Sequence, residues 1–397
     1  MTETTIDPNL IYDTFLKNDG AWRRWKAWFH LLLFLPSIVY LHKKAVGNKK
    51  TLFHVFLDMW KLIWHHFGLN VIQESPQLFI DEYYTGRLHL KSHPIDEYIL
   101  EREGVTIFWM SSVLQWGKIR QLDHKLTGWK WLSDKGIATT QRLGQLLKVG
   151  DQLVCETPHG QKETLQNLIL NNGGSVFIKP NDGALGKGCA IIQLKQEKLF
   201  VNGQNTSIAA LHDFITEPML IEEHVQSIKE LASFHPSSLN TLRLITMRKP
   251  EGEIYLDRAV IRMGVGGSKV DNWSAGGVCV KINHDGTLDK YGHFKDISQL
   301  PCTEHPDSKI TFKGFKIPQF DKAVELVLQA HSKVKRINGM GWDIAITTRG
   351  PIVIEMNPFF MLFQTPCGPL RKIIYKRYLE QARKSLKIML DSKTKHS

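Results

Sequence analysis

The stretch GWDIAITTRGPIVIEMNP, residues 341–358, contains two short apolar runs, IAI and IVI, separated by TTRGP. Apolar runs on either side of such a turn signal predict a hairpin of two buried β-strands. Asp343 stands at the start of the first run, and Glu355 and Asn357 stand at the end of the second. In an antiparallel pair these positions lie side by side, so we expect the three polar side chains to converge.

Two carboxylates that converge repel each other unless a cation lies between them. Carboxylate and amide oxygens are ligands that suit Mg²⁺. The hairpin therefore offers a magnesium site made by Asp343, Glu355 and Asn357. The alternative is two acids at strand ends that each face water, and the hairpin alone does not decide between the two.

Composition is that of an ordinary globular protein. The 397 residues are enough for two or three domains, and 42% hydrophobic with 23% charged residues does not favour extended disorder. The five cysteines are scattered without a CxxC pair. That pattern indicates neither a zinc site nor a disulfide framework, and it fits a reducing compartment such as the cytoplasm.

The net charge of +12 is concentrated at the two ends of the chain. Residues 21–50 carry seven lysines or arginines and no acid, and residues 371–397 carry nine against two acids. The two ends together carry +14, so the rest of the chain sums to −2. A nucleic-acid enzyme carries its positive field around the site itself, so we expect no nucleic-acid partner and favour an anionic surface such as phospholipid.

The segment AWRRWKAWFHLLLFLPSIVYLHKK, residues 21–44, combines tryptophans with basic residues. Its apolar part, residues 27–41, is shorter than the roughly 20 residues of a spanning helix, and Pro36 interrupts it. Aromatic rings beside cations are typical of a membrane-interface segment, and the alternative is a helix packed on the main domain. The basic tail has apolar residues at four-residue steps, which predicts an amphipathic helix docked on the surface.

The middle of the chain predicts helices and strands in mixed order. LDHKLTGWKWLSDKGIATT predicts a helix that ends near Gly136, and KETLQNLILNNGGSVFIKPNDGALGKGCAIIQL predicts helix, strand, glycine-rich loop and strand. PMLIEEHVQ predicts a short strand, and NTLRLITMRKPEGEIYLDRAVIRMGVGG predicts two strands joined by a turn at residues 249–252. FDKAVELVLQAHSKVKRI predicts an amphipathic helix before the hairpin. Hairpin-linked strands with helices between them predict an α+β fold.

Lys179 ends an apolar strand, and a loop with Gly183, Gly186 and Gly188 follows it. A lysine meets phosphate as a point charge, and a loop without side-chain bulk lets backbone N–H groups approach phosphate oxygens. The loop is not a P-loop, because Gly188 follows Lys187 where that motif requires Ser or Thr. A glycine-rich hairpin alone is weak evidence of phosphate binding.

The run LIEEHV, residues 220–225, predicts a strand that leads into a linker. Extended backbone there offers the acceptor and the donor that adenine requires, and Glu230 lies one turn further on, where a carboxylate can hold ribose hydroxyls. Acidic strand ends are common, so this string alone means little.

Arg243 and Arg262 lie within apolar strands. A lone buried cation costs several kcal/mol unless an anion or a carboxylate partners it, and a structural ion pair would explain one of the two. The loop SKVDNWSAGG, residues 268–277, adds Asn272, a serine and two glycines in a form suited to a polar substrate.

These features follow one another in a set order: lysine, glycine loop, acidic hinge, arginine strands, Asn-x-x-x-Gly-Gly loop, then Asp and Glu-x-Asn. The order resembles the ATP-grasp superfamily, and more narrowly the sugar-transfer-associated ATP-grasp family, which is similar to the α-L-glutamate ligases. The resemblance covers residues 105–370 and rests on the order of the motifs rather than on one of them. It implies an α+β ATP-grasp fold, in which two α+β subdomains grip ATP, with a mainly helical N-terminal extension.

The resemblance also implies residue roles. Lys125 in LDHKL would be the first nucleotide lysine and Lys179 the second. The other nucleotide contacts would be the glycine loop, the adenine hinge and the ribose acid, namely Gly183, Gly186, Gly188, Glu222, Glu223, Val225 and Glu230. Magnesium or manganese would be held by Asp343, Glu355 and Asn357, and the catalytic residues would be Arg243, Arg262 and Asn272. No general base stands out, and nothing favours either of the candidates, His224 and His235.

The implied function is ATP-dependent ligation of a carboxylate to an amine through an acyl-phosphate. The family name implies a small-molecule or lipid-linked sugar carboxylate and an amino acid amine, used in surface polysaccharide synthesis at the inner face of the membrane. The alternatives are an amino acid or peptide ligase unrelated to sugars and a non-catalytic nucleotide-binding partner in a glycan assembly complex. The expected regions are helices in 1–104, an N-terminal lobe in 105–225, a C-terminal lobe with the metal site in 226–370, and a basic tail in 371–397.

Overall fold

The computed structural model describes residues 21–47, 50–65, 76–85, 93–112, 122–181, 188–335, 337–358 and 360–394. The helices of four residues or more are α2 (Ala21–Leu32), α3 (Leu35–Lys44), α4 (Leu52–His65), α6 (Pro76–Thr85), α7 (Glu101–Ser112), α9 (Lys125–Asp134), α10 (Leu165–Asn171), α11 (Ile208–Phe214), α12 (Lys229–Ala232), α13 (Phe320–Lys333), α14 (Gln364–Cys367), α15 (Arg371–Ile374), the π-helical η5 (Tyr375–Leu379) and α16 (Glu380–Thr394). The strands are β1 (Arg142–Val149), β2 (Gln152–Glu156), β3 (Lys162–Glu163), β4 (Ser175–Pro180), β5 (Ala190–Lys195), β6 (Lys198–Val201), β7 (Gln204–Thr206), β8 (Met219–Glu223), β9 (Leu242–Arg248), β10 (Ile254–Met263), β11 (Val278–Ile282), β12 (Leu288–His293), β13 (Gly339–Thr347) and β14 (Gly350–Asn357).

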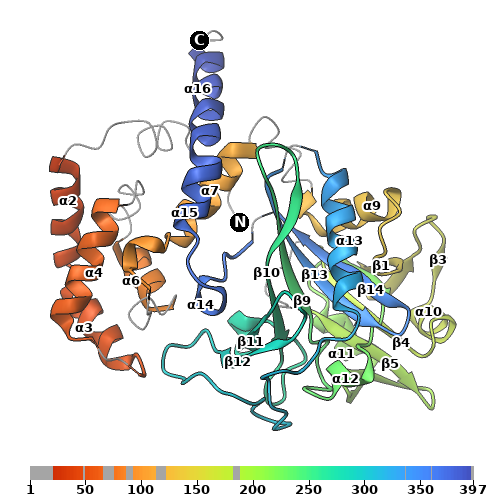
Figure 1. Ribbon diagram of the computed structural model, residues 1–397. Coiled ribbons are helices and arrows are strands. Elements are labelled where there is room, and N and C mark those ends of the chain that lie inside the picture. The colour runs from red at the N-terminus through yellow and green to blue at the C-terminus, as the bar shows by residue number, and fades with distance from the viewer. Residues whose placement is uncertain are drawn as a thin grey trace.

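These elements form two antiparallel sheets and a separate group of N-terminal helices (Figure 1). In Figure 1 the helices α2, α3 and α4 lie on the left, the sheets lie on the right, and α7, α15 and α16 lie between them. The helix predicted to end near Gly136 is α9, and the predicted hairpin at residues 341–358 is the pair β13 and β14. The α+β class with a helical N-terminal region is therefore confirmed.

The first sheet has eight strands in the order β3-β2-β1-β8-β4-β5-β6-β7. Helices α10 and α11 cover one face, where Ile178 and Ile221 are fully buried with Leu168 and Leu211. Because side chains alternate along a strand, Lys179 and Glu222 lie on the opposite face from these isoleucines.

The second sheet has six strands in the order β12-β11-β10-β9-β13-β14. Helix α13 covers one of its faces, and Leu244, Trp342 and Ile344 are buried in the core beneath it. The alternation of side chains therefore places Arg243 and Asp343 on the other face.

Part of that other face is covered by α7 and the C-terminal helices. Ile245 and Met247 of β9 pack there with Phe108, Ile374 and Tyr378. The predicted docking of the tail is thus seen for the first residues of its apolar stripe, which are buried. Arg243 lies two residues before Ile245 on the same face of β9, so the apolar cover is next to the charged residues.

The N-terminal helices have a core of their own, which includes Ala27, Leu31, Ile38 and Val55. The apolar run at residues 27–41 is divided between α2 and α3, with Pro36 in the first turn of α3, where proline is tolerated. No helix within the described ranges is long and apolar enough to cross a membrane.

Candidate functional site

The hairpin of β13 and β14 contains the three predicted metal ligands. Asp343 lies directly opposite Glu355, and Gly341 lies opposite Asn357. The register shifts at a bulge immediately after Asp343, which is the kind of irregularity that re-aims side chains near sites. Burial and the neighbouring charge of Asp343 raise the pKa of Glu355, so the two carboxylates are close enough to repel each other.

Asp343 is held by both of the predicted arginines. Arg243 lies opposite it on β9 and donates from Nε to Oδ1 and from Nη2 to Oδ2 at 2.9 Å. Arg262 on β10 donates from Nη2 to Oδ2, also at 2.9 Å. Burial opposes ionisation of Asp343, but the two guanidinium groups outweigh it and hold its pKa below the usual value. The sequence left an ion pair as the explanation for one arginine, and the structure pairs both.

Glu355 is less well compensated than Asp343. Lys179, Arg243 and Lys125 each lower its pKa, but burial and Asp343 leave the net shift upward. Among the described residues Glu355 forms no ion pair within 4.0 Å. Its neighbour Asn357 has a buried Nδ2 atom without a hydrogen-bond partner in that same part of the chain. Since amide oxygen and nitrogen are interchangeable by rotation, Asn357 can present its oxygen instead.

The donor set fits a magnesium ion, with one condition. Two carboxylates and an amide are hard oxygen ligands, and the repulsion between Glu355 and Asp343 is what a cation relieves. However, three guanidinium N–H groups already use three of the roughly four acceptor positions on Asp343. Asp343 therefore has fewer acceptor positions left for a cation than Glu355, which forms no ion pair among the described residues. No group of three or more His, Cys, Asp or Glu side chains in the described ranges is placed to hold a metal.

The two predicted nucleotide lysines lie close together. Lys179 forms an ion pair of 2.7 Å with Glu222, and Lys125, at the start of α9, donates to the carbonyl of Pro180 at 3.0 Å. Burial raises the pKa of the Cys189 thiol, Lys125 and Lys179 lower it, and Glu355 and Glu222 raise it. The charges of Lys125, Lys179 and Glu355 therefore all act on one thiol, which places them in the same region of the molecule.

The predicted adenine hinge is already engaged in contacts within the protein. The carboxylate of Glu223 accepts from the backbone N–H of Gln141 at 2.8 Å. The backbone N–H of Glu223 donates to the carbonyl of Gln141 at 2.9 Å. Its oxygens also accept from Arg349 at 2.6 and 2.7 Å. Val225, at the end of the same segment, is half-buried. Contacts of Glu222, Glu223 and Val225 with adenine stay a prediction.

Other predicted residues have structural roles or an exposed position, or lie outside the described ranges. Glu230 is exposed on α12, and the side chain of Asn272 accepts from Ser274 N at 2.9 Å and caps a short 3-10 turn. Gly183 and Gly186 lie outside the described residues. Gly188 has φ +72°, and a Cβ there would be 2.8 Å from the ring of Pro180, so this position requires glycine.

The two candidate bases have structural partners. His224 Nδ1 lies 3.1 Å from Ser175 Oγ, and burial lowers its pKa. His235 contacts Ser238 Oγ at 2.9 Å and the carbonyl of Gly266 at 2.8 Å. Neither histidine has a geometry that favours it as a general base.

Sequence reasoning missed the residues that support the arginines. Arg262 Nη2 donates to Thr241 Oγ1 at 2.7 Å, and the Thr241 N–H donates to Asp271 at 2.5 Å. Arg349, which binds Glu223, lies in the β13–β14 turn and was also missed. A threonine before a strand and an arginine in a turn carry no distinctive pattern, so no local signal pointed to them.

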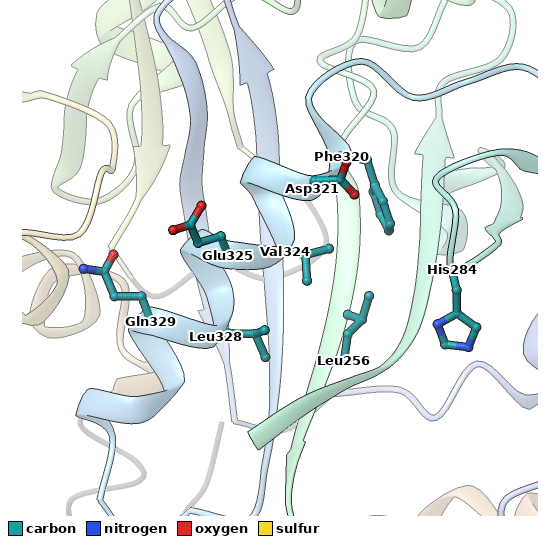
Figure 2. A pocket seen from close by; sticks show the side chains of 8 residues that line it. All are labelled: Leu256, His284, Phe320, Asp321, Val324, Glu325, Leu328 and Gln329. Carbon is teal, nitrogen blue, oxygen red and sulfur yellow. The ribbon is translucent and has the colours of Figure 1, made fainter. Parts of the chain in front are cut away.

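A hollow of about 530 Å³ lies elsewhere, between α13 and β10 (Figure 2). Figure 2 shows apolar side chains beside two acids on α13, and none of the predicted site residues lines the hollow. Its lining residues are Leu256, His284, Phe320, Asp321, Val324, Glu325, Leu328 and Gln329. The hollow lies on the α13 face of the sheet, and Arg243 and Asp343 lie on the opposite face. We therefore take the charged residues around Asp343, and not this hollow, as the candidate site.

Comparisons with known proteins agree with the resemblance. A family model described as sugar-transfer associated ATP-grasp matches residues 121–366. None of the curated proteins matches the chain.

Several solved structures are similar at low identity. N5-carboxyaminoimidazole ribonucleotide synthetase from Thermotoga maritima has 14% identity over 59% of this chain and 41% of its own, with a TM-score of 0.30. The biotin carboxylase domain of 2-oxoglutarate carboxylase from Hydrogenobacter thermophilus has 11% identity over 68% and 46%, with a TM-score of 0.39. D-alanine–D-alanine ligase from Bacillus anthracis has 15% identity over 68% and 69%, with a TM-score of 0.36. The match spans less than half the length of the first two proteins. The family model alone covers more than half of this chain, and on that ground the protein belongs to the sugar-transfer associated ATP-grasp family.

Proposed function

We propose that this protein is an ATP-dependent ligase that joins a carboxylate to an amine through an acyl-phosphate. The observation that supports this most is the meeting of charges from two sheets: Lys125 and Lys179 act on the same carboxyl, Glu355, that lies opposite Asp343. Cations on one side and oxygen ligands on the other suit a magnesium-bound triphosphate. Two arginines beside the ligands suit a second anion, the carboxylate to be activated.

The proposed reaction has two steps. A carboxylate oxygen attacks the γ-phosphorus of ATP, the bond to the β–γ bridging oxygen breaks, and ADP leaves with that electron pair. The amine nitrogen then attacks the acyl carbon, phosphate leaves with its bonding pair, and the nitrogen loses a proton to give the amide. The products are the amide, ADP and phosphate.

The residues of the site divide this work by charge. Lys179 and Lys125 neutralise phosphate oxygens, and to do so Lys179 exchanges Glu222 for phosphate. Glu355 and Asn357, joined by Asp343, would hold Mg²⁺ or Mn²⁺, which when bound supplies charge neutralisation for the transferred phosphate. Arg243 and Arg262 orient the substrate carboxylate and stabilise the negative charge of the tetrahedral intermediate. We place Asn272 and the adjoining glycines at the amine side of the site.

We propose that the carboxylate belongs to a sugar, such as a uronic acid, either free or lipid-linked, and that the amine belongs to an amino acid. The family description supports a role in the synthesis or modification of surface polysaccharide. The basic ends of the chain support a location at the inner face of the membrane. An amino acid or peptide ligase unrelated to sugars and a non-catalytic nucleotide-binding partner are the alternatives that the experiment below separates.

The test is product analysis with ATP, Mg²⁺, hydroxylamine and a series of carboxylates, beginning with uronic acids and their nucleotide-linked forms and then amino acids. We expect ADP and a hydroxamate when the correct acid is present, because hydroxylamine intercepts an acyl-phosphate. AMP as the product contradicts the proposal, and ADP formed with amino acids but not with sugars supports the peptide-ligase alternative. Absence of both ADP and hydroxamate with every acid supports the non-catalytic alternative.

Matched lysine variants identify the site in the same assay. Lys179→Ala removes a buried lysine of the proposed nucleotide site, and Lys198→Ala removes an exposed lysine of the same sheet. We expect loss of ADP formation with the first and wild-type rates with the second. Equal rates in the two variants contradict the assignment of Lys179.

A further inference from the structure

Exposed large apolar side chains gather on the N-terminal helices. Within the described part of the chain, nine such residues lie between positions 22 and 57, and seven are scattered over the rest. The nine are Trp22, Trp25, Phe29, Leu32, Leu33, Leu35, Tyr40, Phe53 and Leu57. Soluble surfaces seldom collect so many large apolar groups in one region, and such a patch marks an interaction site.

Helix α2 is apolar on two faces. Ala27 and Leu31 are fully buried against the other helices, so the inner face already has its partner. Trp22 and Phe29 lie seven residues apart on the outer face and are 78% and 65% exposed, and Leu33, directly after the end of α2, is 67% exposed. An apolar face turned outward in this way marks an interaction site.

Helix α4 extends the outer face of α2. Phe53 and Leu57 are exposed one turn apart, and Trp60 follows at the next helical step. The ring of Trp60 contacts Trp25 at a centroid distance of 4.9 Å and Trp28 at 5.4 Å. The outer stripes of α2 and α4 therefore adjoin, and we call their exposed residues, together with Leu33 at the end of α2, the aromatic face.

The charges around the aromatic face are positive. Helices α2 and α3 contain no acid, and Lys26, Lys43 and Lys44 are exposed on them. The acid of α4, Asp58, forms an ion pair of 2.6 Å with Lys50 and accepts from Tyr83 at 2.8 Å, so its charge is already compensated. The N-terminal helices thus combine exposed aromatic side chains with exposed lysines that form no ion pair among the described residues.

We propose that the aromatic face docks on an anionic lipid bilayer and lies in its interface without crossing it. Tryptophan and tyrosine rings sit at headgroup level, and lysines beside them are attracted to anionic headgroups. A second copy of the chain is disfavoured as the occupant, because two faces with the same positive charge repel each other. The helices are at most 14 residues long, which fits helices that lie along a surface rather than span it.

This surface is inferred from the helices alone and does not rest on the ligase reaction. Docking through the aromatic face would bring the sheets close to substrates anchored in the same bilayer. Failure of the ligase proposal would not contradict membrane docking through this face, and failure of docking would not contradict the ligase proposal.

The test is co-sedimentation of the full chain with vesicles of phosphatidylcholine containing 30% phosphatidylglycerol, compared with pure phosphatidylcholine. We expect binding to the anionic vesicles that weakens as salt rises, since surface attraction is screened. Trp22→Ser, Phe29→Ser and Leu33→Ser in one chain should weaken binding at least about tenfold, because they remove the exposed apolar stripe. Replacing Lys26, Lys43 and Lys44 by Gln should weaken it about fivefold for each lysine.

A matched control replaces Val149, Leu170 and Ile208 by Ser, since these side chains are also exposed but belong to the eight-stranded sheet region. Wild-type binding by this control, with the fold of every variant checked by circular dichroism, supports the proposal. Three results overturn it: no sedimentation of the wild-type chain, equal binding to neutral vesicles, or equal loss in the control. Self-association without lipid that the Trp22, Phe29 and Leu33 substitutions abolish would also overturn it, because a second copy would then cover the face.

Discussion

The two faces of the six-stranded sheet bury polar groups in opposite ways. Under α13, Trp342 Nε1 donates to Thr246 Oγ1 at 2.8 Å, Thr246 contacts His331 Nδ1 at 2.7 Å, and His331 Nε2 donates to the carbonyl of Ile337 at 2.9 Å. Each side-chain group in that chain has a partner, and none of them needs a charge.

The opposite face buries a row of charges instead. Glu355, Asp343 and Arg243 occupy successive strands in register, and Arg262 adds a second cation at Asp343. Asp343 faces two guanidinium cations with one negative charge, while Glu355 has its pKa raised. A satisfied neutral network stabilises a core, whereas an unbalanced charged row indicates a place for a ligand.

Glu355→Gln gives the largest expected effect on this contrast. If Glu355 is a metal ligand, its substitution should lower ATP turnover by about a thousandfold, because the metal that it holds stabilises the charge of the transition state. The same change should raise the melting temperature, because burial and Asp343 make the ionised carboxylate costly at neutral pH. Turnover and thermal melts of this variant, with the exposed Glu251→Gln as control, check both signs. A lower melting temperature with full turnover would mean that Glu355 is structural.

Asp343→Asn should have the opposite profile for stability. The substitution leaves Arg243 and Arg262 buried without their counter-charge, which costs about 3–5 kcal/mol in the free energy of unfolding. Urea unfolding of Asp343→Asn beside Glu355→Gln measures the difference directly. Similar stability of the two variants would contradict the division between an anchored carboxylate and a free one.

Much of this site could be predicted from local sequence. The hairpin and its register follow from two apolar runs and a turn, so the meeting of Asp343 with Glu355 was within reach. Lys179 at a strand end and the arginines within strands were also visible, because strand periodicity places them. The order of these motifs, rather than any one of them, indicated the fold.

The pairing of these charges was out of reach of the sequence. Arg243 and Asp343 are 100 residues apart, as are many cross-strand neighbours, and no local rule says that both arginines choose the same carboxylate. The ion pair between Lys179 and Glu222 likewise depends on how β4 and β8 pair. The aromatic and basic composition of α2 could be predicted, but which of its two apolar stripes faces outward could not. Periodicity does not say which of two apolar stripes is buried.

Acid should lower the stability of the protein through His331, which is buried on the α13 face of the sheet. Burial lowers the pKa of His331 to about 4, with nearby Arg248 acting in the same direction and the Ile337 carbonyl against it. The unfolded value is 6.5, so the stability that this group contributes is present above pH 6.5 and is lost as the pH falls toward 4. The expected loss over that window is about 3 kcal/mol.

Urea unfolding at pH 7 and pH 4 measures this loss. His331→Gln should remove it from the pH dependence, although it lowers stability at pH 7 by disturbing the bonds to Thr246 and Ile337. His284→Gln, at an exposed position, should keep the wild-type pH dependence. An acid loss in His331→Gln equal to that of wild type would show that other groups dominate.

The smallest effect on stability is expected for an arginine–carboxylate ion pair that is exposed to solvent. Arg349 and Glu223 form an arginine–carboxylate contact of 2.6 Å between the two sheets, but their side chains are 60% and 20% exposed, against 9% and 6% for Arg243 and Asp343. Water and salt screen an exposed pair, so a double-mutant cycle of Arg349→Gln and Glu223→Gln should give a coupling energy below about 1 kcal/mol that shrinks as salt rises. A coupling of several kcal/mol, independent of salt, would mean that the link between the sheets is as desolvated as the charged row, and burial would then no longer explain why Asp343 is the anchor.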